Sequence, residues 1–401
     1  MKAIWSVLFL AGSAFGQQVQ MPADVDSQKI DAAIKKGVEF LRTAPSPAHD
    51  HAGPHSDELI LWTMIHAGVP ETDGKFQELV TKILGSPLER TYKVALQAMI
   101  FEELNRVKYQ NRIWQCAQFI VDNQCANGQW SYGQPTEAAN NVPTGSIFRD
   151  VASGGGKTRD FGGSAPAAGG ERVKPKVQKR MAVKKSKDGP PTGDNSNSQY
   201  ATLGLRSCHD AGINIPDATL HLAKKWWIDS QYQTGADKGA VATGTEFDAK
   251  PGGWCYCARD SHQPYAAMSA GAVGSVVILD YMLDKDWKKD ICVRAGMAWL
   301  AQHFSVTENL GPTQHGGNPK NFYHYYLYAL ERAGLLYGTE KIGSHLWYAE
   351  GAKVLLAEQK PDGKWEGSQW SNPTWDTCFA ILFLKRATRP LVATESGGGK
   401  K

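Results

Sequence analysis

Residues 359–385, QKPDGKWEGSQWSNPTWDTCFAILFLK, predict the end of a helix, a glycine-rich corner that carries a tryptophan, and then a strongly apolar helix. One spacing of glutamine, glycine and tryptophan occurs twice in the chain, at Gln359, Gly363 and Trp365 and again at Gln124, Gly128 and Trp130. A third, degenerate corner, PGGWCYC, contains Trp254, and its helix-end glutamine would be Gln231. Three copies of one corner indicate an internal repeat built from one supersecondary unit.

Helical periodicity dominates the chain between the corners. The segment 30–41 places Ile30, Ile34 and Val38 on one side and charged residues on the other, as in an amphipathic helix. The segment 264–283 is apolar nearly all round, which is typical of a helix buried on every side. Twelve helical segments are predicted, at 30–41, 56–67, 74–84, 91–104, 109–123, 195–211, 217–230, 264–283, 287–304, 322–333, 344–358 and 374–386.

These segments alternate in character along the chain. Odd-numbered segments are amphipathic, whereas even-numbered ones are richer in apolar and small residues. Short, glycine-marked turns lead from even to odd segments, and the longer connections from odd to even carry the tryptophan corners. A single hairpin cannot cover its own apolar face, so neighbouring hairpins must close on one another. We therefore predict an all-α fold over residues 17–388, an (α/α)6 toroid of six helical hairpins with an inner and an outer ring.

The ends of the chain and one insertion depart from this pattern. Residues 1–16 combine a lysine, a short apolar run and small residues, which predicts a cleaved signal peptide and a secreted or periplasmic protein. No later apolar run is long enough to span a membrane. Residues 135–193, rich in glycine, proline and basic residues, are predicted to be a disordered insertion, and 389–401 a disordered tail.

Charge is concentrated in that insertion. Between residues 156 and 188, ten Lys and Arg face three acids, although the whole chain has a formal net charge of only +4. The rest of the chain is therefore slightly acidic, which argues against a nucleic-acid-binding protein. The basic segment instead suggests electrostatic contact with acidic polymers of the cell envelope.

The corners resemble the QW repeats of the squalene cyclase and prenyltransferase superfamily, whose members are α/α toroids. The resemblance covers about residues 26–388 without the insertion, with two corners matching fully and the one at Trp254 partially. It implies an exported bacterial member with an isoprenoid-type ligand in its central cavity, and corner residues that serve as scaffold. The acidic D-x-D-D motif of triterpene cyclases, the D-D-x-x-D motif of ionising terpene synthases and the G-C-G-E-Q motif of thioester proteins are absent. An ordinary triterpene cyclase is therefore disfavoured.

The same resemblance suggests a zinc site. Protein prenyltransferases hold zinc through a D-x-C sequence at one inner-helix start and a histidine at another. Asp376 and Cys378 match D-x-C here, and His324 in NFYHYYLYAL resembles the histidine segment, although it precedes D-x-C instead of following it. His55 is a further candidate, because a closed ring places the first hairpin beside the last. One Cys, one or two His and one Asp would suit zinc with an open position. An acid in a first helical turn and a cysteine in an apolar run also have purely structural explanations.

Three functions remain open at this stage. An enzyme acting on an isoprenoid would carry its chemistry at the inner-helix starts, with Asp376, His324 and Asp57 as candidate catalytic groups. A non-catalytic binding or scaffold protein of the cell envelope is the second alternative. The third is a carbohydrate-active (α/α)6 enzyme with a glycan ligand, which would use carboxylates such as Asp57, Glu58 or Asp376 together with aromatic platforms.

Overall fold

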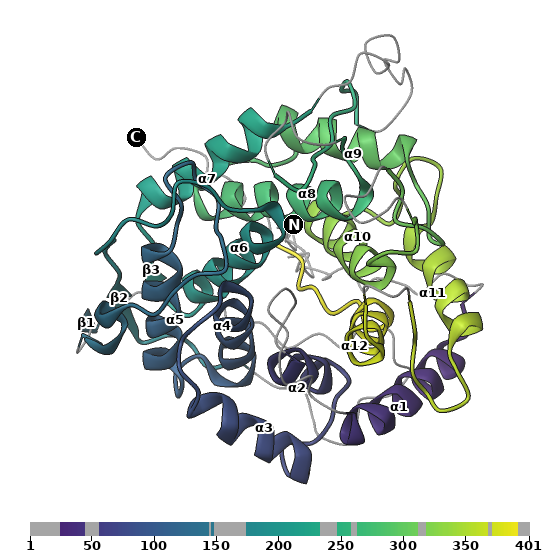
Figure 1. Ribbon diagram of the computed structural model, residues 1–401, viewed down its shortest axis with the longest axis horizontal. Helices are drawn as coiled ribbons and strands as arrows, with labels where there is room; N and C mark the ends of the chain where they lie inside the picture. The colour runs from purple at the N-terminus through teal and green to yellow at the C-terminus, as the bar shows by residue number, and fades with distance from the viewer. Residues whose placement is uncertain are drawn as a thin grey trace, which may run out of the picture.

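The computed structural model describes residues 25–44, 56–143, 146–147, 174–232, 247–257, 263–311, 318–367 and 371–391. In this part of the chain, twelve α-helices form two concentric rings (Figure 1). The inner ring consists of α2 (Ser56–His66), α4 (Thr91–Asn105), α6 (Asn195–Asp210), α8 (Ala266–Met282), α10 (Tyr323–Tyr337) and α12 (Pro373–Leu384). The outer ring consists of α1 (Ser27–Thr43), α3 (Gly74–Leu84), α5 (Gln110–Asp122), α7 (Asp217–Ser230), α9 (Ile291–Gln302) and α11 (Trp347–Glu358). Each inner helix packs on the next, and α12 returns to α2. The predicted all-α toroid is confirmed.

The two rings differ in burial as their sequences predict. On α1, Ile30, Ile34 and Val38 face the inner ring and are buried, while the charged positions between them are exposed. On α8, every residue except Tyr281 is buried. Removal of apolar surface from water, at about 25 cal/mol per Å², is the main force that holds such layers together. Among the described residues, no helix has the length and apolarity needed to cross a bilayer.

The tryptophan corners share one set of hydrogen bonds. Each indole is fully buried and donates its N–H to a carbonyl near the end of the preceding outer helix. These bonds run from Trp130 to Ile120 (2.7 Å), from Trp254 to Trp227 (2.8 Å) and from Trp365 to Leu355 (2.8 Å). Each corner glutamine donates to a carbonyl of the next outer helix: Gln124 to Thr219 (2.9 Å), Gln231 to Cys292 (2.9 Å) and Gln359 to Ala33 (2.8 Å). The corners thus join one outer helix to the next.

The last of these corners closes the ring. The Gln359 side chain reaches Ala33 of α1, which lies 326 residues earlier in the chain. One layer further in, the indole N–H of Trp375 on α12 donates to the hydroxyl of Ser56 at the start of α2 (2.9 Å). Both rings therefore end where they begin, and α12 packs against α1 and α2 together.

Glycine is required at the two full corners for two reasons. Gly128 and Gly363 have φ angles of +96° and +90°, a backbone conformation that side chains with a Cβ rarely adopt. A Cβ at either position would also lie inside van der Waals contact of a backbone carbonyl of the next outer helix, that of Leu222 or of Lys36. The glycines let adjacent repeats approach closely.

The C-terminal part of the predicted disordered insertion is ordered, which differs from our expectation. Residues 144–145 and 148–173 lie outside the described residues, but β2 (Lys179–Ala182) pairs with β1 (Ser146–Ile147) and with β3 (Ile213–Asn214). Side chains on one face of α5 donate to the backbone of this segment: Gln110 to Lys179 (2.8 Å), Trp114 to Ala182 (2.8 Å) and Gln118 to Lys184 (2.7 Å). The segment shows little hydrophobic periodicity because it forms no helix. Its backbone carbonyls instead accept hydrogen bonds from side chains of α5.

The start of the predicted disordered tail is also held in place. After α12, the chain crosses the carboxyl ends of the inner helices, where the backbone N–H and hydroxyl of Thr388 donate to both oxygens of Glu331 (2.8 and 2.6 Å). Arg389 pairs with Glu103 of α4. Residues 392–401, like the predicted signal peptide at 1–16, lie outside the described residues.

Candidate functional site

Two of the predicted site residues meet at the amino ends of adjacent inner helices. His324 lies in the first turn of α10, and Asp376 lies in the first turn of α12. Local sequence fixes the second position, because Asn372 caps α12 through the backbone N–H of Trp375 (3.0 Å) and Pro373 occupies the first helical position, where its fixed φ is favourable. The two side chains are each only 2% exposed.

The contacts of this pair are directional. Nδ1 of His324 lies 2.9 Å from Oδ1 of Asp376. The same carboxylate accepts hydrogen bonds from the backbone N–H of Gly367 (2.8 Å) and the hydroxyl of Ser371 (2.6 Å). Within the described residues, the buried Nε2 atom of His324 has no hydrogen-bond partner. The sequence motifs predicted His324 and Asp376 but not their partners Gly367 and Ser371, although Ser371 stands in an S-N-P sequence directly before the helix.

This arrangement suits proton transfer. Three donors satisfy the Asp376 carboxylate in its charged form. The carboxylate orients the imidazole by accepting from Nδ1–H, which leaves Nε2 with a lone pair as the base. A histidine fixed in this way by a carboxylate is the acid/base half of catalytic triads on several unrelated folds.

The other predicted carboxylates do not join the pair. Asp57 forms an ion pair with Lys82 of the outer helix α3 (2.6 Å). Glu58 is buried and accepts from the side chain of Gln97 (2.9 Å), and burial raises its pKa to about 7. Both acids lie on the inner helix α2 and contact neighbouring helices, Asp57 the outer helix α3 and Glu58 the inner helix α4. His55 lies outside the described residues.

The predicted zinc ligands do not come together in the part of the chain that the structure describes, which leaves out His55. The described residues contain no group of three or more His, Cys, Asp or Glu side chains that could hold a metal ion. Residues two apart on a helix do not share a face, and the Cys378 side chain forms a hydrogen bond with Thr63 of α2. Full burial raises the pKa of the Cys378 thiol to about 12, as expected for a cysteine packed among apolar side chains. Cys378 is a core residue.

The axis of the toroid is occupied by aromatic side chains. Tyr92 and Tyr200 lie with ring centroids 4.3 Å apart, and Tyr200 stacks on Tyr325. The guanidinium of Arg332 lies over the ring of Tyr328, 4.3 Å from its centroid. All five side chains are buried. This cluster, which the sequence did not predict, fills the centre between the described helices.

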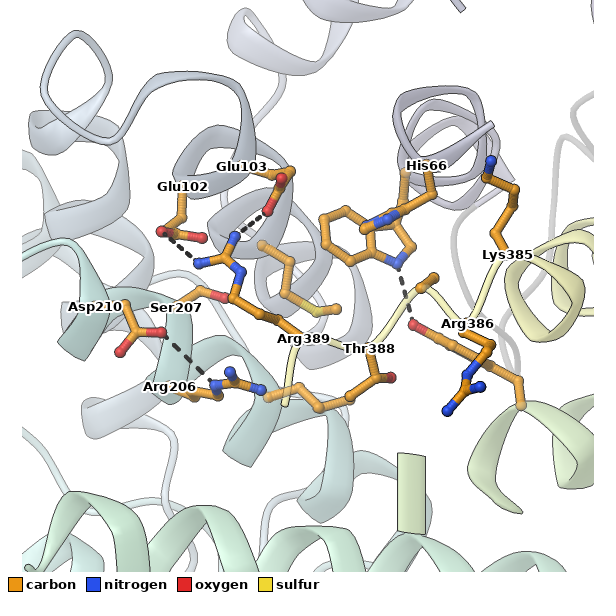
Figure 2. Close-up of a pocket in the computed structure, with 15 residues that line it drawn as sticks. His66, Glu102, Glu103, Arg206, Ser207, Asp210, Lys385, Arg386, Thr388 and Arg389 are labelled. Carbon is orange, nitrogen blue, oxygen red and sulfur yellow. Dashed lines mark hydrogen bonds and ion pairs between the residues drawn. The ribbon is translucent and has the colours of Figure 1, made fainter. Parts of the chain in front are cut away.

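A small cavity lies at the other end of the inner ring. It has a volume of about 80 Å³ and is lined by the last turns of α2, α4 and α6 together with residues 385–389 (Figure 2). Figure 2 shows Glu102 and Glu103 facing Arg389, and Asp210 facing Arg206. The indole of Trp62, which donates to the hydroxyl of Tyr328 (3.2 Å), forms an apolar wall. No sequence motif pointed to this cavity, because its residues come from α2, α4, α6, α10 and residues 385–389, five segments that are far apart in the sequence.

Comparison with known proteins bears on the fold and on the family. No protein-family model matches the sequence, and no curated protein matches it significantly. A crystal structure titled as "a possible member of GH105 family" from Salmonella enterica is similar to this chain, with a TM-score of 0.51 and 10% sequence identity over 96% of this chain and 99% of that one. The family predicted from the corners, the squalene cyclase and prenyltransferase superfamily, was therefore wrong. At this identity the likeness shows a shared fold, an (α/α)6 toroid, and leaves the activity to be argued from the site.

Proposed function

We propose that this protein is a carbohydrate-active (α/α)6 enzyme in which His324 is the general acid/base and Asp376 holds it in position. The observation that carries the proposal is the buried imidazole, bonded through Nδ1 to a carboxylate and unbonded at Nε2 among the described residues. The structural likeness to a possible GH105 family member supports a glycan as substrate, although fold analogy alone does not name a reaction.

The chemistry follows from the geometry of the pair. Nε2 of His324 removes a proton from a water, and the adjacent carboxylate stabilises the imidazolium that forms. The water oxygen bonds to the anomeric carbon as the glycosidic carbon–oxygen bond breaks, and the proton held on Nε2 passes to the departing oxygen. Such positioned acid/base catalysis contributes about 10²- to 10⁴-fold to rate. Two facing carboxylates are usual in glycosidases, but Asp57 and Glu58 contact Lys82 and Gln97 and do not complete such a pair.

The experiment is a survey of neutral and acidic oligosaccharides for cleavage, with product detection by chromatography and mass spectrometry. Once a substrate is found, His324→Ala and Asp376→Asn should each lower kcat by about 100-fold or more. Asn at 376 keeps the shape but bonds the wrong imidazole tautomer, so its pH–rate profile should also change. The control is His345→Ala, because His345 forms a half-exposed pair with Glu350.

Equal activity of the wild type and both dyad variants would refute the assignment. Circular dichroism and melting temperature establish that each variant is folded, so that a loss of kcat reports chemistry and not stability.

A second candidate function has its own supporting observation. The aromatic cluster on the axis, with Tyr92, Tyr200 and Tyr325 in mutual contact, fills the space that a cavity enzyme would use. A non-catalytic glycan-binding or scaffold protein of the cell envelope would need no such space. Calorimetric titration with the same oligosaccharides separates the two, because saturable binding of an oligosaccharide without cleavage would favour this second function. Export, which residues 1–16 support, fits either function and can be tested by fractionating cells that produce the full chain.

A further inference from the structure

The cavity at the carboxyl ends of the inner helices is separate from the His324–Asp376 pair. The pair occupies the first turns of α10 and α12, whereas the cavity is lined by the last turns of inner helices and by residues 385–389 after α12. The twelve residues of α12 span about 18 Å at 1.5 Å per residue. A ligand in this cavity would therefore not contact the proposed catalytic pair.

Arg206 provides unused hydrogen-bond donors at this cavity. Its side chain is only 10% exposed, and its closest partner is Asp210, with Nε 3.6 Å from Oδ2. That separation is too long for a hydrogen bond, and the described part of the chain gives this guanidinium no hydrogen bond and no closer ion pair. A buried guanidinium normally satisfies its planar set of donors with carboxylates or other anions. The hydroxyl of Ser207, beside Arg206 on α6, also lines the cavity.

The surroundings of Arg206 are positively charged. Six cations line the cavity or pair with the acids that do: Arg106, Lys174, Arg206, Lys385, Arg386 and Arg389. Three carboxylates line it, Glu102, Glu103 and Asp210, and a fourth, Glu340, pairs with Arg386 from outside. The two glutamates are already engaged, because Lys174 lies 2.6 Å from each of them. Burial also raises the pKa of Glu102, which weakens the hold of its negative charge on the neighbouring cations. A bound anion would balance the positive charge that these carboxylates leave unpaired.

We propose that this cavity binds a small oxyanion, a short carboxylate or an inorganic phosphate, on Arg206 and Ser207. The Arg206 guanidinium has the fork geometry that matches two oxygens of such an anion. The Ser207 hydroxyl would donate a third hydrogen bond to an oxygen of the same anion. Trp62 and Tyr328 form the apolar wall that would pack on the body of a carboxylate. The volume of about 80 Å³ limits the ligand, since an engineered cavity of about 150 Å³ holds one benzene.

The oxyanion would also join two parts of the fold. Arg206 and Ser207 belong to α6, whereas the cavity's other wall is formed by residues 385–389, which follow α12. Binding should therefore stabilise the segment after α12 as well as α6.

The test is isothermal titration calorimetry of the full chain with sodium acetate and, separately, sodium phosphate, each at an ionic strength matched with sodium chloride. Wild-type protein should show saturable binding of at least one anion, and comparison of the two titrations identifies which. Arg206→Gln should weaken that binding by about tenfold or more, because a neutral amide loses the charge-assisted bonds. The matched control is Arg294→Gln on the outer helix α9, where the guanidinium bonds to the carbonyl of Phe247 (3.0 Å), and it should bind like the wild type.

A second variant guards against misfolding of Arg206→Gln. Ala387→Leu fills the cavity from the opposite wall without changing a charge, and it should abolish binding. Absence of saturable binding in the wild type would overturn the proposal. Wild-type affinity in both Arg206→Gln and Ala387→Leu would also overturn it, because the anion would then bind elsewhere. His324→Ala should retain wild-type affinity, so failure of this site and failure of the proposed function are distinguishable.

Discussion

Substitution of Gly363 by alanine tests the role of the closing corner. The backbone at Gly363 has φ = +90°, which costs a residue with a Cβ about 1–2 kcal/mol. The new methyl group would also overlap the Lys36 carbonyl oxygen of α1, so the corner must move away from α1. That movement weakens the hydrogen bond from Gln359 to Ala33, which is worth about 1 kcal/mol. Together these effects predict a loss of about 2–3 kcal/mol in the free energy of unfolding.

The assay is urea unfolding, followed by tryptophan fluorescence and far-ultraviolet circular dichroism. The midpoint should fall while the slope stays constant, which indicates a change in stability alone. Gly74→Ala is the matched control, because Gly74 begins α3 and has no atom within 4 Å of an added Cβ. It should leave stability within about 0.5 kcal/mol of the wild type. Gly128→Ala, at the equivalent corner, should repeat the loss. If Gly363→Ala also stays within about 0.5 kcal/mol, the close contact between repeats does not constrain the ring.

Two further predictions concern buried charges. Because burial raises the folded-state pKa of Glu58 from 4.5 to about 7, the stability that this proton provides is complete below about pH 4.5 and is lost as the pH rises through 7. Glu58→Gln should remove about 3 kcal/mol of this pH dependence, measured by urea unfolding below pH 4.5 and above pH 7. If the free energy of unfolding of Glu58→Gln changes with pH as it does in the wild type, the burial argument is contradicted. Lys174→Met leaves two buried carboxylates of α4 without their shared cation and should destabilise the protein by about 3 kcal/mol. Lys225→Met, which removes an exposed ion pair, should cost less than about 1 kcal/mol, and equal effects of the two lysine variants would show that the segment from 174 is not structural.

The helical layers could be predicted because their signal is local. Periodicity and burial follow from neighbouring residues, and an Asp or Asn side chain caps the start of five of the described helices, α1, α3, α6, α9 and α12. The errors occurred where a residue serves a distant partner. We expected this helix to end at Ala333, before Gly334, but α10 continues through Gly334 to Tyr337. Gly334 is not a helix stop; it is a glycine because a Cβ there would overlap the indole of Trp347. The helix ends at Gly338, whose φ of +81° is the true stop.

The candidate site was predictable only in part, for the same physical reason. His324 and Asp376 could be paired because both occupy first turns of inner helices, and repeat architecture places such turns on one face. The direction of Cys378 toward α2 depends on side-chain rotation about α12, which the D-x-C spacing does not determine. The pairing of Arg389 with Glu103 spans 286 residues, and no local pattern records it.

The bond between Gln359 and Ala33 has a consequence for how the chain is made. Translation adds about 5–20 residues per second, so the 326 residues between these partners take roughly 20–60 seconds to emerge. During that interval the ring of helices is incomplete. The apolar surface of α1 and α2 that α12 later covers is exposed to solvent. The time needed to synthesise the chain from Ala33 to Gln359 thus sets how long this surface can bind chaperones or aggregate. A longer segment between residues 144 and 173 would extend that time.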